Sequence, residues 1–130
     1  MNTLMDHLDT LNRPKTIAHI DSNVDNFLFL PDGDLKLIDW EYCGMIDVAM
    51  CGIYSYLNEE QMDWLIHIYL HREPTEEERT VIYSYVALGG FLWSLWAVYK
   101  SELGEEFGEY TIIMYRYAKR YYRRLHEQIH

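Results

Sequence analysis

The stretch HIDSNVDNFLFLPDGDLKLIDWEY, residues 19–42, decides the fold expected for this chain. Two apolar tetrads, at residues 27–30 and 35–38, are separated by the polar run PDGD. Its Asp32-Gly33 pair is typical of the tight turn that joins two antiparallel strands. The sequence therefore predicts a small β-hairpin that turns at this pair.

The register of this hairpin decides which polar groups meet at its open end. A two-residue turn pairs Phe27 with Ile38 and sets Asn26 opposite Asp39. Facing residues of an antiparallel pair have Cα atoms about 4.5 to 5.5 Å apart. A longer loop would shift the register by one residue and would still leave Asn26 and Asp39 neighbours.

Outside the hairpin the chain is expected to be helical, because its apolar residues recur at spacings of three and four. A capping box, Thr75 with Glu78, opens a long helix, and Gly104 and Gly108 break the chain before the last helix. The fold class is mainly α with a small β-hairpin, an α+β arrangement, in a single domain. We expect helices over about Thr3 to Asn12, Glu59 to His71, Thr75 to Lys100 and Glu109 to Ile129.

Composition and charge exclude several classes of protein. The 130 residues are 49% hydrophobic, which suffices for one globular core. With 21 acidic and 11 basic side chains the net charge is -10, so we expect no nucleic-acid partner. Two cysteines cannot form a disulfide framework, which favours the cytoplasm. Residues 81–99 are uncharged and long enough to span a bilayer. Their glycines, serines and tyrosines favour a buried core helix, so we expect no membrane association.

Three polar side chains fit phosphoryl transfer from ATP. Residues 19–26 have the form H-x-D-x-x-x-x-N, and Asp39 follows the second apolar tetrad. This reaction needs a carboxylate that positions the acceptor hydroxyl and takes its proton, together with oxygen ligands for Mg²⁺. Asp21 suits the first role, while Asn26 and Asp39 suit the second.

The run HIDSNVDNFLF…LKLIDWEY resembles the catalytic loop and metal-binding segment of the choline and ethanolamine kinases, which share the protein-kinase-like superfamily with aminoglycoside phosphotransferases. The resemblance covers the chain from about Ile17 to Leu125 and fits bacterial choline kinases best. It implies a partial kinase carboxy-terminal lobe. In that lobe residues 15–42 hold the catalytic loop and metal-binding hairpin, and residues 43–130 form a helical substrate-binding subdomain.

The same resemblance implies an activity and assigns roles to residues. It implies an ATP- and Mg²⁺-dependent phosphotransferase with an alcohol acceptor, most closely choline, which becomes phosphocholine. Asp21 would be the catalytic base, and Asn26 and Asp39 the metal ligands. Asp47, in a shortened copy of a family stretch, matches an acid that orders the catalytic loop.

An aromatic pair is the candidate site for the acceptor. Trp93 and Trp96 lie about 60° apart around a helix and so share a face, and aromatic faces attract a quaternary ammonium group. Such a pair alone is ordinarily part of a core, but the run FLWSLWAVY resembles the helix that supplies choline-pocket tryptophans. By the same resemblance Glu41 and Tyr42 add a carboxylate and a ring. Tyr110, or another tyrosine of the last helix, completes the cage.

The sequence departs from the family in having no Gly-rich phosphate loop and no strand lysine, the parts that cover ATP. We therefore expect a fragment or truncated gene product without the amino-terminal lobe, with weak or no ATP binding and no activity alone. An apolar surface left where that lobe would dock favours self-association. Two alternatives stay open: an aminoglycoside-type phosphotransferase, which would use acidic substrate contacts, and a non-catalytic choline-binding or interaction module.

The last helix carries a group of basic residues, namely Arg116, Lys119, Arg120, Arg123 and Arg124. Cations near a helix C-terminus complement the helix dipole, which is the simplest interpretation. A partner or membrane-surface role is the alternative.

Overall fold

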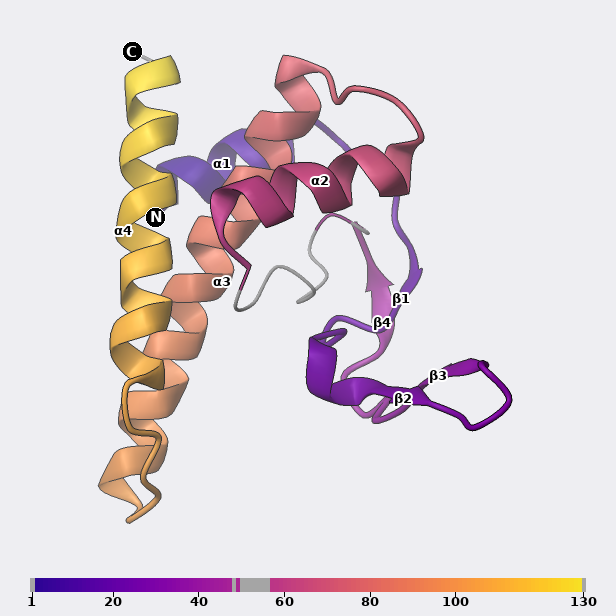
Figure 1. The fold of residues 1–130 in the computed structure, drawn as a ribbon. Coiled ribbons are helices and arrows are strands. Elements are labelled where there is room, and N and C mark those ends of the chain that lie inside the picture. Colours follow the sequence, from indigo (N-terminus) through magenta and orange to yellow (C-terminus); the bar gives the residue numbers. More distant parts are fainter. Residues whose placement is uncertain (1, 48, 50–56, 130) are drawn as a thin grey trace. The chain divides into compact units, whose positions relative to one another are not determined.

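The computed structural model describes residues 2–47, 49 and 57–129, which fold into two compact units (Figure 1). Residues 1–12 and 76–130 make up the first, called here the helical unit. Residues 13–75 make up the second, called here the hairpin unit. The expectation of a single domain stays a prediction.

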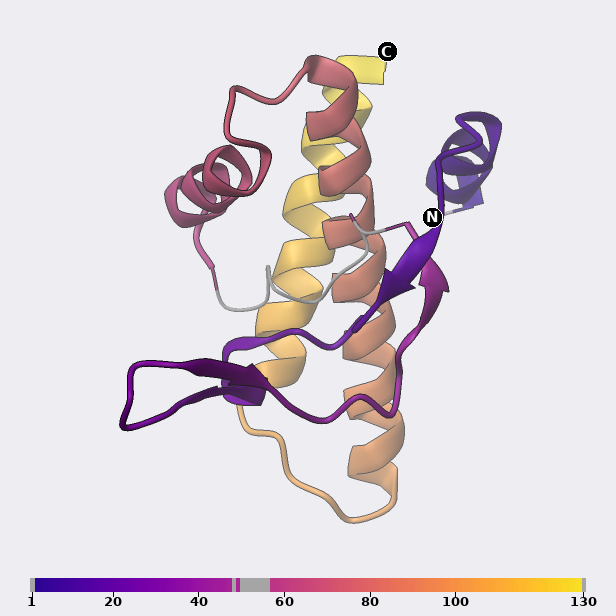
Figure 2. The same ribbon diagram turned by 90° about the vertical axis from the view of Figure 1, so that its right-hand side faces the viewer.

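Two long antiparallel helices form the helical unit, α3 (Glu76–Glu102) and α4 (Tyr110–Ile129), which lie side by side (Figures 1 and 2). The short helix α1 (Asn2–Thr10) packs against α3. All three begin and end within two residues of their predicted bounds, so these predictions are confirmed. The core of the unit includes Leu4, Leu8, Val81, Ala87, Met114, Ala118, Tyr121 and Leu125.

A glycine sets how closely the two long helices approach. A Cβ atom on Gly90 would lie 2.7 Å from the carbonyl oxygen of Met114 and 2.9 Å from the amide nitrogen of Ala118. The preceding Gly89 has nothing within 4 Å of the same position. Only Gly90 is therefore required by the contact between α3 and α4.

By length and composition α3 could cross a membrane, and half of its most apolar window is buried inside the protein. The core helix of a soluble protein passes the same test, so this finding is weak evidence for a span. Val81, Ala87 and Ala97 are fully buried in α3, which supports the interpretation as a core helix.

The described residues of the hairpin unit form four strands of three residues each: β1 (Thr16–Ala18), β2 (Phe27–Phe29), β3 (Leu35–Leu37) and β4 (Gly44–Ile46). They form two antiparallel pairs, β1 with β4 and β2 with β3. The mainly α fold with a small hairpin is confirmed. The expectation that only helices follow the hairpin is wrong, because β4 pairs with a strand far away in the sequence.

The hairpin register differs from the predicted one by a single residue. Phe27 faces Leu37 rather than Ile38, and the amide of Leu30 donates to the carbonyl of Asp34 at 2.8 Å. The loop therefore has three residues, and its last one, Gly33, has a φ of +87°. A three-residue hairpin loop ends in such a left-handed residue, which glycine adopts without strain.

The helix α2 (Glu59–Leu70) completes the hairpin unit and agrees with its predicted range. Asn58 caps it, because the Asn58 side chain accepts from the amide of Gln61 at 2.8 Å and Gln61 Oε1 accepts from the amide of Asn58 at 2.9 Å. The helix ends at His71, which has a φ of 55° in the left-handed region.

Candidate active site

The candidate catalytic loop begins with a strained turn. The amide of Asp21 donates a 2.9 Å hydrogen bond to the carbonyl of His19, and Ile20 between them has a φ of +70°. This is the rarer, strained form of the γ-turn, and a β-branched residue rarely adopts it. Strain of this kind costs about 1–3 kcal/mol and persists only where surrounding contacts impose it. The contacts that hold Asp21 are therefore as informative as Asp21 itself.

Asn26 provides the main contacts with Asp21. A short 3-10 turn, Val24–Asn26, is capped by Asn23, whose side chain accepts from the amide of Asp25 at 3.0 Å. Asn26 Nδ2 then lies 2.7 Å from the backbone oxygen of Asp21 and 3.3 Å from its Oδ2. Asn23 Nδ2 donates to Asp21 Oδ1 at 3.0 Å. Amides therefore hold both carboxylate oxygens of Asp21, while the buried Asn26 presents its Oδ1 as an acceptor.

The backbone of Ile38 joins this loop to the hairpin. Its amide donates to the carbonyl of Asn26 at 2.9 Å, and its own carbonyl accepts from Nε2 of the buried His19 at 2.6 Å. The His19 ring also meets Trp40 edge to face, with centroids 4.8 Å apart. The histidine of the motif therefore acts as a structural tie between loop and hairpin.

Asp39 directly follows this junction. It is exposed and has a φ of +63°, a left-handed conformation that few residues other than glycine adopt. Within the described ranges, no hydrogen bond joins its side chain to Asp21 or Asn26, and no group of three His, Cys, Asp or Glu side chains could hold a metal. The structure thus brings Asp21 and Asn26 into contact. Asp39 directly follows Ile38, whose amide donates a hydrogen bond to the carbonyl of Asn26.

Amide and carboxylate oxygens are suitable donors for Mg²⁺, which keeps several waters and takes one or two protein carboxylates together with substrate phosphates. Asn26 Oδ1 and the exposed Asp39 carboxylate fit such a partial donor set. Their roles as metal ligands stay predictions.

A partly buried ion pair in the hairpin unit was not expected from the sequence. Asp47 accepts from Arg13 Nε, from the Arg13 Nη2 at 3.5 Å and from the amide of Ala49 at 3.0 Å. Arg13 precedes β1 and Asp47 follows β4, so the pair closes one end of this two-stranded sheet. The other end of β1 leads directly to His19. The family pattern pointed to Asp47, but no local pattern marks Arg13 as its partner.

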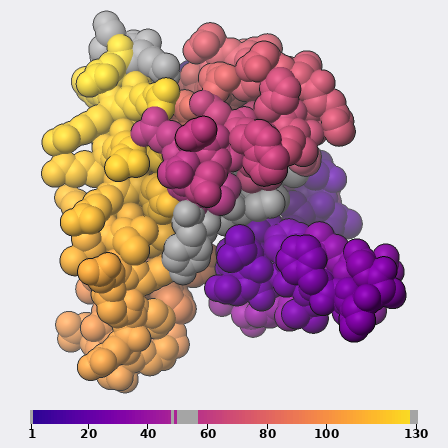
Figure 3. Space-filling view, viewed as in Figure 1, coloured from indigo at the N-terminus to yellow at the C-terminus, as the bar shows by residue number. Residues whose placement is uncertain are grey.

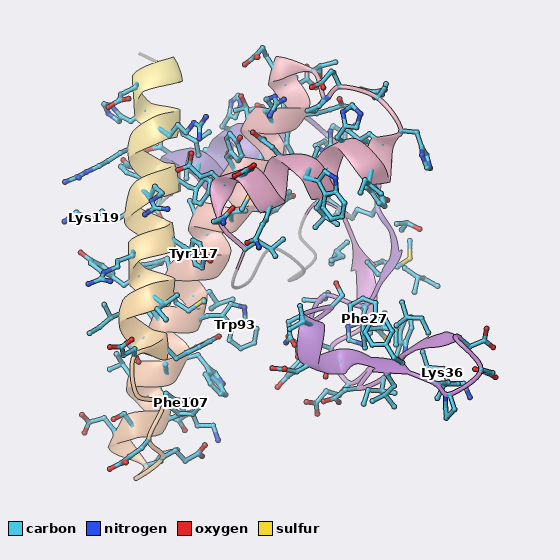
Figure 4. All side chains as sticks on the ribbon, in the orientation of Figure 1. Phe27, Lys36, Trp93, Phe107, Tyr117 and Lys119 are labelled. Carbon is cyan, nitrogen blue, oxygen red and sulfur yellow. The ribbon has the colours of Figure 1, made fainter. Side chains whose placement is uncertain are left out.

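The aromatic residues of the helical unit form a continuous chain of rings. Trp93 and Trp96 meet edge to face with centroids 5.5 Å apart, as expected for a shared helix face. Phe107, which Figure 4 labels, follows α3 in the loop before α4. Its ring centroid lies 5.1 Å from that of Trp96 and 6.2 Å from that of Tyr110. Sequence reasoning missed Phe107, which connects Tyr110 to the tryptophans. The only signal for it was a lone aromatic residue between two glycines.

The ammonium group of Lys100 lies beside this cluster of aromatic rings. Lys100 Nζ lies 5.8 Å from the centroid of a Trp96 ring and 2.7 Å from Glu105 Oε1. An ammonium group is attracted to the negative face of an indole ring. The half-buried Trp96 is therefore suited to hold a positive charge.

Glu41 and Tyr42, the other predicted acceptor contacts, are exposed in a turn of the hairpin unit. The tryptophans and Tyr110 belong to the helical unit. A cage that combines these two groups stays a prediction.

Several known proteins are similar to this chain in sequence or in structure. No protein-family profile matches the chain. Protein LicA from Haemophilus influenzae is 32% identical over 114 residues, which cover 80% of this chain and 32% of that protein. Choline kinase LicA from Streptococcus pneumoniae is 32% identical with a TM-score of 0.73, covering 92% of this chain and 44% of that one. The chain is related to the choline kinases.

A further choline-kinase structure, LicA in complex with AMP, is 30% identical and has a TM-score of 0.78. The match covers 95% of this chain and 44% of that one. The chain thus spans less than half the length of each of these choline-kinase relatives. The expected relation to choline kinases and the partial kinase-like fold are confirmed.

Proposed function

We propose that this chain carries the catalytic and acceptor-binding part of a kinase that transfers the γ-phosphate of ATP to the hydroxyl of choline, giving phosphocholine. Similarity to choline kinase LicA supports the reaction class. The observation that carries the proposal is the pair of hydrogen bonds from Asn26 Nδ2 to Asp21. These bonds orient one carboxylate and one amide oxygen within a single loop.

Asp21 is the base in this proposal. The hydroxyl oxygen of the acceptor bonds to the γ-phosphorus, the bond from that phosphorus to ADP breaks, and the hydroxyl proton passes to Asp21. A carboxylate offers about four acceptor positions, so the bonds from Asn23 and Asn26 leave room for a substrate hydroxyl. Positioning supplies most of the catalysis in such reactions, which gives the tied loop its purpose.

Asn26 and Asp39 would hold Mg²⁺, which when bound neutralises charge on the phosphates of ATP. The bonds of the Ile38 backbone to Asn26 and His19 support this assignment, because they tie the segment that carries Asp39 to the segment that carries Asn26.

Trp93, Trp96 and Tyr110 would face the trimethylammonium group of choline, and we add Phe107 to this set. The Lys100 ammonium beside Trp96 supports the choice, because it occupies the kind of position that an acceptor cation would take. Glu41 and Tyr42 would add a carboxylate and a ring. Aromatic rather than acidic contacts favour choline over an aminoglycoside. We expect the reaction in the cytoplasm, where ATP is available.

Binding measurements on the whole chain test this proposal. Mn²⁺ replaces Mg²⁺ at oxygen sites, and electron paramagnetic resonance follows its binding. We expect Asp39→Asn to weaken Mn²⁺ binding by about tenfold or more. Asp34→Asn removes the same charge at the other end of the hairpin and is the matched control. Equal binding by the two variants would contradict the metal assignment.

Tryptophan fluorescence, titrated with choline, tests the acceptor site. Trp96→Ala should abolish the response, whereas Trp64→Ala, which removes an exposed indole from α2, should retain it. Choline-dependent ATP turnover is measured in parallel. Because the chain alone is expected to be inactive, choline binding together with Mn²⁺ binding that depends on Asp39 supports the proposal even without turnover. Choline binding without such Mn²⁺ binding would favour the non-catalytic choline-binding module, and loss of both with an intact fold would contradict the proposal.

A further inference from the structure

The solvent-facing side of α4 carries a basic stripe, defined as Arg116, Lys119, Arg120 and Arg123. These residues are spaced three and four apart, so they occupy an arc of about 100° around the helix and about 10 Å of its length. The opposite side of α4 holds the buried Met114, Ala118, Tyr121 and Leu125. Figure 4 shows Lys119 pointing away from α3, and Figure 3 shows α4 along one flank of the helical unit, in orange to yellow.

The helix dipole does not explain this basic stripe. Its effect falls off within the last turn, and α4 ends at Ile129, about 20 Å beyond Arg116. Like charges three and four residues apart destabilise a helix, by about 0.2–0.5 kcal/mol per pair. No ion pair joins Arg116, Lys119 or Arg123 to an acid in the part of the chain that the structure describes. In a chain with a net charge of -10, such a concentration of cations calls for an anionic partner.

The acidic counterpart lies on the same helical unit. Glu109 is exposed, and its carbonyl accepts from the amide of Ile113 at 3.0 Å, so it sits at the first turn of α4. Its position around the helix falls within the arc of the basic stripe, because Arg116 follows it by seven residues. Between acid and base lie Ile112 and Tyr115, each 53% exposed.

Along one side of α4 the order is therefore acid, apolar, basic. When a second copy of α4 lies antiparallel to the first, the acidic end of each helix side meets the basic end of the other. Two antiparallel copies related by a two-fold axis at the level of residue 114, between Ile112 and Tyr115, would set each Glu109 at the height of the other copy's Lys119. The exposed apolar residues would meet at the centre. A two-fold interface repeats every contact, so each charged pair counts twice.

We propose that the chain associates with a second copy of itself through this side of α4, with Glu109 of each copy against the basic stripe of the other. The proposal is independent of the kinase function. Exposed ion pairs are individually weak, so the dimer is transient and depends on ionic strength. It also differs from the expected self-association through the apolar surface left where the amino-terminal lobe would dock, which stays a prediction.

Sedimentation equilibrium on the full chain tests the proposal by a charge swap. Lys119→Glu should raise the dimer dissociation constant by about tenfold, because two contacts become repulsive. Glu109→Lys should do the same. Mixing the two variants should restore association, because both contacts are then between opposite charges. Lys36→Glu, an equal change of charge on the hairpin, is the control and should leave the dissociation constant within about twofold.

Circular dichroism checks that each variant keeps its helices. Association should weaken from about 0.05 M to about 1 M salt as screening shortens the range of the charges. A wild-type chain that stays monomeric at low salt would overturn the proposal. So would a mixture of the two variants that associates no better than either alone. Monomers that bind anionic lipid vesicles through Lys119 would overturn it in favour of a membrane surface.

Discussion

The two units of this molecule are built in contrasting ways. The helical unit rests on a helix of 27 residues and one of 20, whose close approach depends on Gly90. The hairpin unit has strands of only three residues, and it contains Ile20, Asp39 and His71 in left-handed conformations. One unit is held by regular packing, and the other by a few polar ties around a strained backbone.

This contrast teaches where the chemistry can be placed. Ile20 directly precedes the candidate base Asp21, and Asp39 is itself a candidate metal ligand. Both have left-handed backbone conformations, and strained conformations gather at functional sites. The contacts that hold them are single bonds, such as those from His19 and Asn26. The hairpin unit should therefore be sensitive to the loss of one polar group, and the helical unit to changes of volume.

The largest expected effect comes from volume in the helical unit. Gly90→Ala should destabilise the protein by about 2–3 kcal/mol, because its Cβ would collide with backbone atoms of Met114 and Ala118. Gly89→Ala, one position away in open space, should instead stabilise it by about 0.5–1 kcal/mol. Urea unfolding monitored by circular dichroism measures both. Equal effects would mean that α3 and α4 are not closely packed at Gly90.

The next effect concerns the polar tie that closes the sheet of β1 and β4. Arg13→Ala should destabilise the hairpin unit by about 2 kcal/mol, because Asp47 is only 6% exposed and would lose its cation. Hydrogen exchange of the β1 and β4 amides should accelerate about 30-fold. Lys15→Ala, an exposed neighbour, is the control. Equal acceleration in α3 and α4 would show that the two units unfold together.

The smallest expected effect concerns the left-handed backbone of Gly33 in the hairpin loop. Gly33→Ala should destabilise by about 1 kcal/mol, because an L-residue resists a φ of +87°. Gly44→Ala, with open space around its Cβ position, should be nearly neutral. The difference between their urea midpoints measures the strain. No difference would argue for a loop that has rearranged.

The same contrast explains which features the sequence could predict. Apolar residues such as Leu4 and Leu8 in α1 and Met114 in α4 belong to patterns with the helical period. The bounds of these helices could therefore be predicted to within two residues. The motif from His19 to Asn26 gave the candidate catalytic loop, because its residue types and spacing are local. A predicted register failed by one residue, since a two-residue and a three-residue loop share the same Asp-Gly signal. That single residue decides what faces Asn26.

Other features depend on contacts between distant parts of the chain. The strand β4 has only three residues and no alternation, and it exists because Thr16–Ala18 lies opposite. Arg13 gains its role only when folding brings Asp47 to it. Phe107 looks like an ordinary loop residue until it packs against Trp96. Local pattern does not contain such information.

Ile38 shows how a position can matter without its side chain. Its contribution consists of one main-chain donor and one main-chain acceptor, which every amino acid except proline possesses. A scan of alanine substitutions would pass over this position as silent. Chemical replacement of its amide by an ester would instead remove the hydrogen bond to the Asn26 carbonyl, one of the two links between the candidate catalytic loop and the hairpin. The link between the candidate catalytic loop and the hairpin is thus made by backbone atoms, and the side chain at this position gives almost no indication of it.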